Sequence, residues 1–286
     1  MAKAESIFNI TSPLLKAELV IRRKWVYYFL NKPLPKFNYY MKHLLNRLVA
    51  AVCCLFFIMS CGKTNMQDYY FPLKSLQKEA KVYEYQLITD NQKRTIYWYY
   101  QTIVQGDSIN FVGTCYDENF QVLQINREEQ VVNGIKLKDL AFYGTDSTGK
   151  SVKMSATIEG GAVFPFEVSD ENSVFVNVIH FADPKDSTHI TTLTRNRRFV
   201  KKTDYDFKGK TLDAALLSMK EEQSERDGRN GGFTHLYDIE ETYARNLGLV
   251  YSKRTLEAGK FFETKLVDTF SMQALESRFD KYLKKQ

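Results

Sequence analysis

The sequence predicts a mainly β protein, built as a curved antiparallel sheet or half-barrel with two helices, one internal and one C-terminal. From Tyr69 onward, apolar and polar residues alternate with a period of two, which is the pattern of strands that bury one face. The runs are dense in aromatic and β-branched residues, and turn residues recur about every 8–12 positions. We therefore expect residues 69–286 to form a single antiparallel β-rich domain.

The strand pattern recurs along the whole of this region. Asn91-Gln92-Lys93 and Gly106-Asp107 provide turn residues between the first runs, as expected for hairpins. In chain order, the predicted strands are Tyr83–Leu87, Thr95–Val104, Ile109–Tyr116, Gln121–Arg127, Ile135–Tyr143, Ser151–Glu159, Val174–Phe181, His189–Val200, Leu236–Ala244, Leu249–Lys253 and Phe261–Asp268.

Two segments depart from this period and predict helices. Over Thr211–Glu225 the spacing of Leu212, Leu216 and Met219 places them on one helical face, with Thr211 as the N-cap. The second helix follows Ser271, another N-cap residue. Its apolar stripe consists of Met272, Leu275, Phe279 and Leu283, and lysines near its end complement the helix dipole.

The stretch from Met41 to Cys61 has the layout of an export signal. A short positive start at residues 42–47 precedes Leu48 to Met59, twelve apolar residues without a break. Such a run suits a signal peptide and is shorter than the roughly 20 residues that span a bilayer. Ile58-Met59-Ser60-Cys61 resembles the lipobox of bacterial lipoproteins. In that family the cysteine is diacylated and becomes the new N-terminus, so the resemblance makes Cys61 the lipidation site.

These features divide the chain before the β domain. We expect Met41 to be the initiator, residues 1–40 to be an upstream extension or disordered tail, residues 41–60 to be the signal peptide and residues 61–68 to be a polar tether. The alternative is a plain membrane anchor over Leu44–Ser60 behind a cytoplasmic tail. That anchor would hold Arg47 in the bilayer, where a charge is costly.

Removal of the leader changes the charge of the protein. The chain has 40 Lys and Arg against 34 Asp and Glu, and residues 1–60 hold nine of the basic and two of the acidic ones. The remainder carries a net charge of −1, so no basic surface for nucleic acid is predicted. The expected partner is a membrane, reached through the lipid anchor, with a lipid or envelope protein as a further partner. We expect the protein in the cell envelope, at the outer membrane and facing the periplasm.

Cysteine content agrees with export. Of the four cysteines, Cys53 and Cys54 lie in the apolar part of the signal and Cys61 is the predicted lipidation site, which leaves Cys115. One cysteine forms no intramolecular disulfide, so the core must stabilise the domain. Cys115 lies in an alternating run and is predicted to be a buried small hydrophobe.

The stretch Gly144–Ser151 matches the nucleotide P-loop pattern. A true P-loop opens into a helix whose N-terminus faces the phosphates. Here Val152, Met154, Ala156 and Ile158 alternate with polar residues, which predicts a strand. We therefore interpret the stretch as a hairpin loop.

Two further groups of residues have a bearing on chemistry. His180, Asp183, Asp186 and His189 are metal-ligand types at regular spacing, but Pro184 and the aspartates between them predict a hairpin connection. His235 with Glu240 and Glu241 could act as an acid–base group, and we interpret these charges as the solvated face of a strand. No metal, cofactor or catalytic residue is predicted.

The segment from Tyr243 to Val250, YARNLGLV, resembles a recurring element of uncharacterised envelope lipoproteins of the Bacteroides group. In those proteins a strand ending in an aromatic residue and Ala-Arg turns through Gly-Leu-Val into the next strand. The resemblance implies a curved antiparallel sheet, and it implies no activity.

Two classes of function follow from these observations. The first is a non-enzymatic binding or assembly module, and the alternative is an envelope hydrolase with dispersed site residues. Tyr97 to Tyr100 place aromatic rings on both faces of one strand, so one face must be covered by helices, a ligand or a partner. This predicts an open apolar groove for a lipid or a partner protein.

Overall fold

The computed structural model describes residues 63–89, 92–169, 173–227, 231–256 and 259–284. The chain divides into two compact units, residues 1–61 and 62–286, and all the described residues belong to the second. The predicted signal peptide and Cys61 therefore lie outside the described residues.

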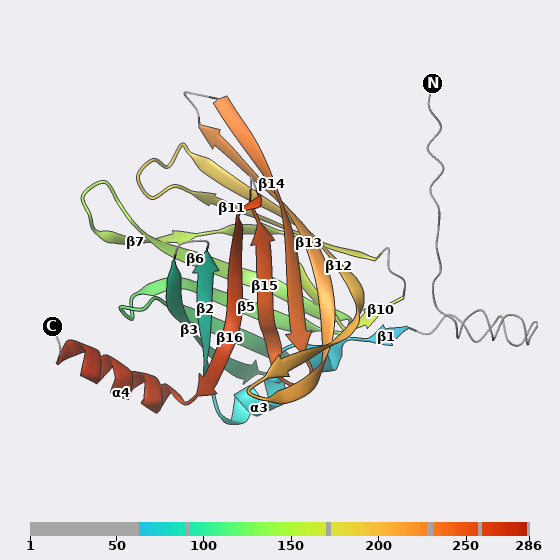
Figure 1. Cartoon of the computed structure of the whole chain (residues 1–286). Coiled ribbons are helices and arrows are strands. Elements are labelled where there is room, and N and C mark those ends of the chain that lie inside the picture. The colour runs from blue at the N-terminus through green and yellow to red at the C-terminus, as the bar shows by residue number, and fades with distance from the viewer. Residues whose placement is uncertain (1–62, 90–91, 170–172, 228–230, 257–258, 285–286) are drawn as a thin grey trace, which may run out of the picture. The chain divides into compact units, whose positions relative to one another are not determined.

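The fold is mainly β, as predicted, and is one long antiparallel meander (Figure 1). Neighbouring strands in the sheet follow the order β7-β6-β5-β4-β3-β2-β16-β15-β14-β13-β12-β11-β8. The bounds are β2 Lys81–Thr89, β3 Lys93–Gln105, β4 Ser108–Tyr116, β5 Val122–Val131, β6 Gly134–Thr145, β7 Ser151–Ser155, β8 Thr157–Glu159, β9 Ala162–Pro165, β11 Val174–Ala182, β12 Ile190–Phe207, β13 Lys210–Asp227, β14 Gly231–Ala244, β15 Gly248–Thr255 and β16 Phe261–Phe270.

The sheet curls until its two edges meet, so that it is barrel-like and nearly closed. β8 pairs with β11 on one side, while β9 pairs with β6 on the other. Around these short strands the backbone N of Ala156 donates to the carbonyl of Leu140 (2.8 Å), and the N of Leu137 donates to the carbonyl of Gly161 (2.8 Å). Residues 156–165 thus join the β6 edge to the β11 edge. The predicted strand Ser151–Glu159 is therefore two strands, which serve different neighbours.

One end of this sheet is closed by the segment that precedes it, and we call it the closed end. β1 (Thr64–Asn65) pairs with β10 (Glu167–Val168), and η1 (Gln67–Tyr69) and α3 (Leu73–Lys78) follow. This segment contributes buried side chains to the main core, namely Met66, Tyr69, Tyr70, Phe71 and Leu76. The segment expected as a polar tether is therefore largely part of the folded unit.

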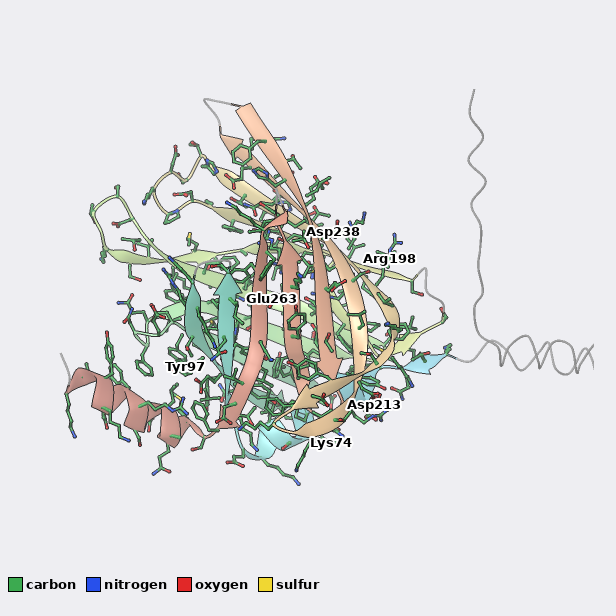
Figure 2. All side chains as sticks on the ribbon, viewed as in Figure 1. Lys74, Tyr97, Arg198, Asp213, Asp238 and Glu263 are labelled. Carbon is green, nitrogen blue, oxygen red and sulfur yellow. The ribbon has the colours of Figure 1, made fainter. Side chains whose placement is uncertain are left out.

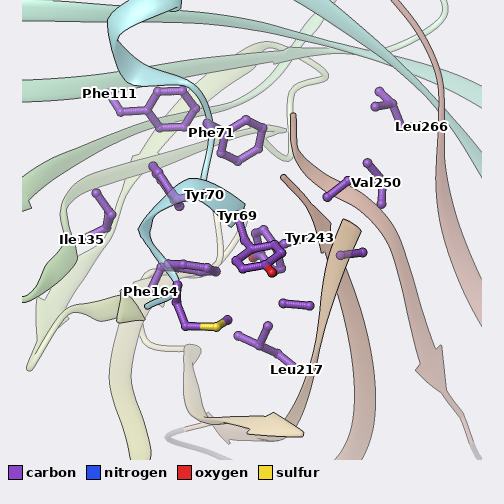
Figure 3. Packing of buried hydrophobic residues seen from close by; sticks show 14 of the residues in the cluster. Tyr69, Tyr70, Phe71, Phe111, Ile135, Phe164, Leu217, Tyr243, Val250 and Leu266 are labelled. Carbon is purple, nitrogen blue, oxygen red and sulfur yellow. The ribbon is translucent and has the colours of Figure 1, made fainter. Parts of the chain in front are cut away.

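The main core lies inside the sheet at the closed end (Figure 3). The Phe71 ring stacks on Phe111 (centroids 4.8 Å apart) and contacts Tyr100 (4.6 Å), while Tyr70 contacts Phe164 (5.3 Å). Inward residues of many strands complete it. A second, smaller cluster of Leu137, Leu140, Ile179 and Leu193 lies where β6 faces β11 and β12.

The C-terminal helix is confirmed and lies on the outside of the sheet. α4 spans Met272–Leu283, and the side chain of Ser271 accepts a hydrogen bond from the N of Ala274, as expected of an N-cap. Arg278 donates to Glu84 of β2 (2.7 Å), and the Phe279 ring contacts Phe120 (centroids 5.2 Å apart). The Phe120 ring in turn stacks on Tyr97 (5.5 Å). The outward ring of Tyr97 is therefore covered by protein.

The predicted helix over Thr211–Glu225 is wrong, because these residues belong to the 18-residue strand β13. β13 pairs with both β12 and β14, and the alternate residues Ala215, Leu217 and Met219 are buried. The helical spacing of Leu212 and Leu216 is a coincidence of sequence. The internal helix of the fold is α3, which periodicity did not indicate.

None of the helices formed by the described residues has the length and apolar character that a bilayer crossing requires.

Candidate functional site

The far end of the barrel-like sheet, which we call the open end, carries charged side chains on its inner face. Strand alternation puts Glu221 on the same face as the buried Leu217 and Met219. Its side chain is only 3% exposed, and Nε of Arg195 donates to it at 2.6 Å. Arg254 of β15 also bonds to this carboxylate. We call Arg195, Glu221 and Arg254 the arginine cluster.

The arginine cluster has more donors than acceptors. Two guanidinium groups share one carboxylate, and an NH2 group of Arg254 also reaches Gln223 at 3.4 Å. Nε of Arg254 is buried and has no hydrogen-bond partner among the described residues. A buried N–H without an acceptor costs free energy unless a ligand or water satisfies it. The cluster is therefore suited to receiving an anionic group.

Aromatic rings line one wall above this cluster. Along β14 the rings of Phe233 and His235 lie 5.2 Å apart and those of His235 and Tyr237 lie 6.1 Å apart. The guanidinium of Arg254 lies over the Tyr237 ring at 3.8 Å, within the range of a cation–π contact. Phe233 is about half exposed, so the wall continues from solvent down to the arginine cluster.

A hollow of about 960 Å³ opens at the lip of this end. Its lining includes His180, Thr192, Ser224 and Thr234, and no member of the arginine cluster. His180 and Thr192 alternate with the buried, inward-facing Ile179 and Leu193, so this part of the hollow lies on the outer face of the sheet. Nε2 of His189 lies 3.0 Å from the carboxylate of Glu225, which ties the β11–β12 connection to β13. The inner face of the open end thus combines charged groups and ring faces.

A second charged group lies deeper, between the arginine cluster and the main core. Arg197 donates to both oxygens of Glu241 (2.7 and 3.1 Å) and to the carbonyl of Val163 (2.8 Å). Both side chains are buried. Burial alone would lower the pKa of Arg197, but the adjacent Glu241 carboxylate raises that pKa above its ordinary value. Arg197 therefore stays charged, and the pair has a structural role.

Glu128 also points into the interior. Tyr70 donates a hydrogen bond to its carboxyl group, and Nδ2 of Asn126 donates at 3.0 Å. Desolvation raises the pKa of Glu128 despite these two donors and the charge of Arg197. Oδ1 of Asn126 is buried and finds no partner among the described residues. Glu128 is thus a carboxyl group whose charged form is held at a cost.

The P-loop look-alike is a hairpin, as predicted. It connects β6 to β7, and Oδ1 of Asp146 accepts from the N of Thr148 (2.8 Å) and the N of Lys150 (3.0 Å). These bonds are those of an ordinary aspartate turn, and a strand follows the loop.

Asp183, Asp186 and His189 lie in the predicted connection between β11 and β12, whereas His180 lies within β11. Asp183 and Asp186 accept from backbone N–H groups within the turn (2.7 and 2.9 Å), while His180 lies 2.9 Å from Thr192. In the described part of the chain, no group of three or more His, Cys, Asp or Glu side chains is placed to hold a metal ion.

The interpretation of Glu240 and Glu241 as a solvated face is right for one residue and wrong for the other. Glu240 is exposed, whereas Glu241 is buried against Arg197. Sequence reasoning missed all members of the arginine cluster as well. The available signal was parity, because Glu241 lies two residues from Ile239 and Tyr243, and both of these are buried.

Cys115 is buried, as predicted, and its thiol forms no disulfide. Burial raises its pKa to about 12, so the thiol stays protonated and unreactive at neutral pH.

Comparison with known proteins gave few matches. No protein family matches the sequence, and no curated protein matches it. Solved structures with a similar arrangement include a candidate lipoprotein from Parabacteroides distasonis (12% identity, TM-score 0.48, 71% of this chain and 98% of that chain). A candidate exported protein with a YmcC-like fold from Bacteroides fragilis is similar to the same degree (9%, 0.47, 71% and 99%). The hypothetical lipoprotein YmcC from Escherichia coli is more distant (10%, 0.30, 71% and 91%).

These neighbours are of the kind that the YARNLGLV resemblance indicated, namely exported proteins and lipoproteins, two of them from bacteria of the Bacteroides group. At these identities and scores, they carry no argument about a ligand, a partner or an activity.

Proposed function

We propose that this protein is a lipid-anchored binding module of the bacterial cell envelope, held at Cys61 in the outer membrane and facing the periplasm. Its ligand site is the arginine cluster at the open end, together with the ring wall of Phe233, His235 and Tyr237. The anchor and the location are supported by the lipobox-like Ile58–Cys61 and the apolar run before it.

The observation that carries the ligand site is the buried, unsatisfied Nε of Arg254 beside two guanidinium groups that share one carboxylate. A carboxylate or phosphate group satisfies that donor and balances the excess charge. The rings above the cluster offer an apolar face to the rest of the ligand. The ligand class is therefore a compound with an anionic group attached to a ring. Inside the closed end the rings of Tyr70 and Phe71 are part of the packed core, which favours the open end as the ligand site.

Calorimetric titration tests this proposal with glucuronate as the anionic ring compound and glucose as its neutral counterpart. We expect glucuronate to bind and glucose not to bind. Arg254→Met should raise the dissociation constant for glucuronate at least about tenfold, which corresponds to the loss of one charged hydrogen bond. Arg198→Met is the matched control, because Arg198 lies on the same sheet with an exposed side chain. Equal binding by the two variants would reject the site. Turnover of a glucuronide substrate would favour the envelope hydrolase instead.

A further inference from the structure

Three exposed apolar side chains lie at the closed end of the sheet, where β3 ends and where β5 turns into β6. Val132, in the β5–β6 turn, is 98% exposed, and Ile103 and Val104 near the end of β3 are each 44% exposed. The tips of turns in soluble proteins are ordinarily polar, so exposed apolar side chains at these positions favour contact with an apolar environment.

These residues lie beside the point where the described chain begins. The carbonyl of Asn133, next to Val132, accepts from the N of Phe166 (3.0 Å), and the carbonyl of Phe166 accepts from the N of Met66 (2.8 Å). Two residues earlier, Thr64 pairs with Val168. In the sequence only residues 62 and 63 separate Thr64 from Cys61, which is a span of about 10 Å at most. The predicted lipid site is therefore tied to this end of the sheet.

The charges at the closed end do not oppose contact with an anionic lipid surface. Lys63 pairs there with Glu167 and Lys208 with Asp268, while Arg245 pairs with both Asp68 and Asp213, so these ion pairs together leave one negative charge. The other exposed charges at this end include Lys74, Lys78 and Lys210 against Glu79, Asp107 and Asp206, so no large excess of either sign results. Figure 2 shows Lys74 at this end, on α3, and Asp238 nearer the open end. Electrostatics thus permits the approach, and the apolar side chains favour it.

We propose that the closed end is a membrane-contacting surface, with Val132, Ile103 and Val104 inserted among the lipid headgroups and the ligand site at the open end directed away from the bilayer. This inference rests on the proposed lipid anchor at Cys61. It deepens the proposed function, because it leaves the arginine cluster accessible to periplasmic ligands.

Fluorescence depth measurements on the lipidated protein test this orientation. Val132→Cys and Thr148→Cys, each in a Cys115→Ala background, receive an environment-sensitive dye. Thr148 is exposed in the β6–β7 hairpin at the opposite end. The protein is reconstituted in vesicles of phosphatidylethanolamine and phosphatidylglycerol that contain a phosphatidylcholine with a nitroxide high on its acyl chain. The lipidated thiol of Cys61 does not react with the dye, so each variant carries one label.

We expect lipid nitroxide to quench the dye at position 132 about fivefold more strongly than the dye at position 148, because interfacial insertion is shallow but direct. Adding Ile103→Asp and Val104→Asp should abolish that difference while the protein stays attached. Equal quenching at the two positions, or stronger quenching at 148, overturns the orientation alone. Mass spectrometry of the same samples separately measures whether Cys61 is acylated. A Cys61 without acyl chains overturns both the proposed anchor and this inference.

Discussion

At the scale of single residues, the molecule is distinguished by charges placed inside a sheet. Arg197 and Glu241 are both buried, and two hydrogen bonds join them. Removing one partner of a buried pair leaves the other charge uncompensated in a medium of low dielectric constant. Each of the two buried charges is therefore stabilised chiefly by the other.

We expect Glu241→Gln to lower the free energy of unfolding by about 3–5 kcal/mol, because Arg197 then remains charged and buried. Glu240→Gln on the exposed face of the same strand is the control and should stay within about 0.5 kcal/mol of the wild type. Urea unfolding at neutral pH measures both. Similar losses in the two variants would show that the pair contributes nothing special. The double variant Arg197→Met with Glu241→Leu should recover much of the loss, since it removes both charges.

Glu128 makes the stability of the protein depend on pH, and the sign of this dependence follows from the direction of its pKa shift. Its pKa is raised in the folded protein, first of all by desolvation. Because the pKa is raised, protonation of Glu128 stabilises the folded state. This stabilisation is fully present below the unfolded pKa of about 4.5 and is lost as the pH rises through the folded pKa. Glu128→Gln should therefore be at least as stable as the wild type at neutral pH, and Gln can donate to the unsatisfied Oδ1 of Asn126. Its stability should fall less between pH 4.5 and 7 than that of the wild type. A steeper fall in the variant would reverse our assignment.

At the scale of elements, local periodicity predicted most strands and the capped C-terminal helix. It failed for β13 because Glu221 and Gln223 take inward positions that a strand pattern reserves for apolar residues. Glu221 is acceptable there only because Arg195 on β12 and Arg254 on β15 meet it. That compensation comes from residues 26 and 33 positions away, so no local pattern contains it. The arginine cluster was unpredictable for the same reason.

The β14–β15 turn shows an element held by a distant one. Gly248 has φ +92°, and a Cβ there would lie 2.5 Å from the Phe71 ring. Arg245 in the same turn pairs with Asp68 and Asp213 (both 2.9 Å) and lies over the Tyr69 ring. The YARNLGLV segment thus packs against the segment before β2 that closes the sheet.

We expect Gly248→Ala to destabilise the protein by about 3 kcal/mol, from left-handed backbone strain together with the clash against Phe71. Gly209→Ala is the matched control, because Gly209 also has a positive φ (+76°) but a Cβ there would meet nothing within 4 Å. It should cost only about 1 kcal/mol. Thermal unfolding of both variants separates the two effects, and equal losses would mean that Phe71 yields to the added methyl group.

At the scale of the whole molecule, the interior has two different halves. The closed end is apolar and filled by residues 66–76, which come before the first strand of the meander. The open end is lined by charges and rings. Residues 156–165 join the two edges of the sheet. A curved sheet follows from strand periodicity, but its closure depends on pairings between β6 and β11 through short, irregular strands. Aromatic content predicted an apolar interior without showing that the chain itself fills it.

The filled closed end leads to the last prediction. Phe71 is buried and touches the rings of Tyr70, Tyr83, Tyr100 and Phe111. Phe71→Ala should cost about 3–5 kcal/mol and open an apolar space at the closed end. Phe233→Ala is the control, since Phe233 is about half exposed at the open end and should cost far less. Binding of a hydrophobic dye, together with hydrogen exchange in β2 to β4, reports the opening. Comparable stability of the two variants, without added dye binding, would mean that residues 66–76 only rest against a core that is already complete.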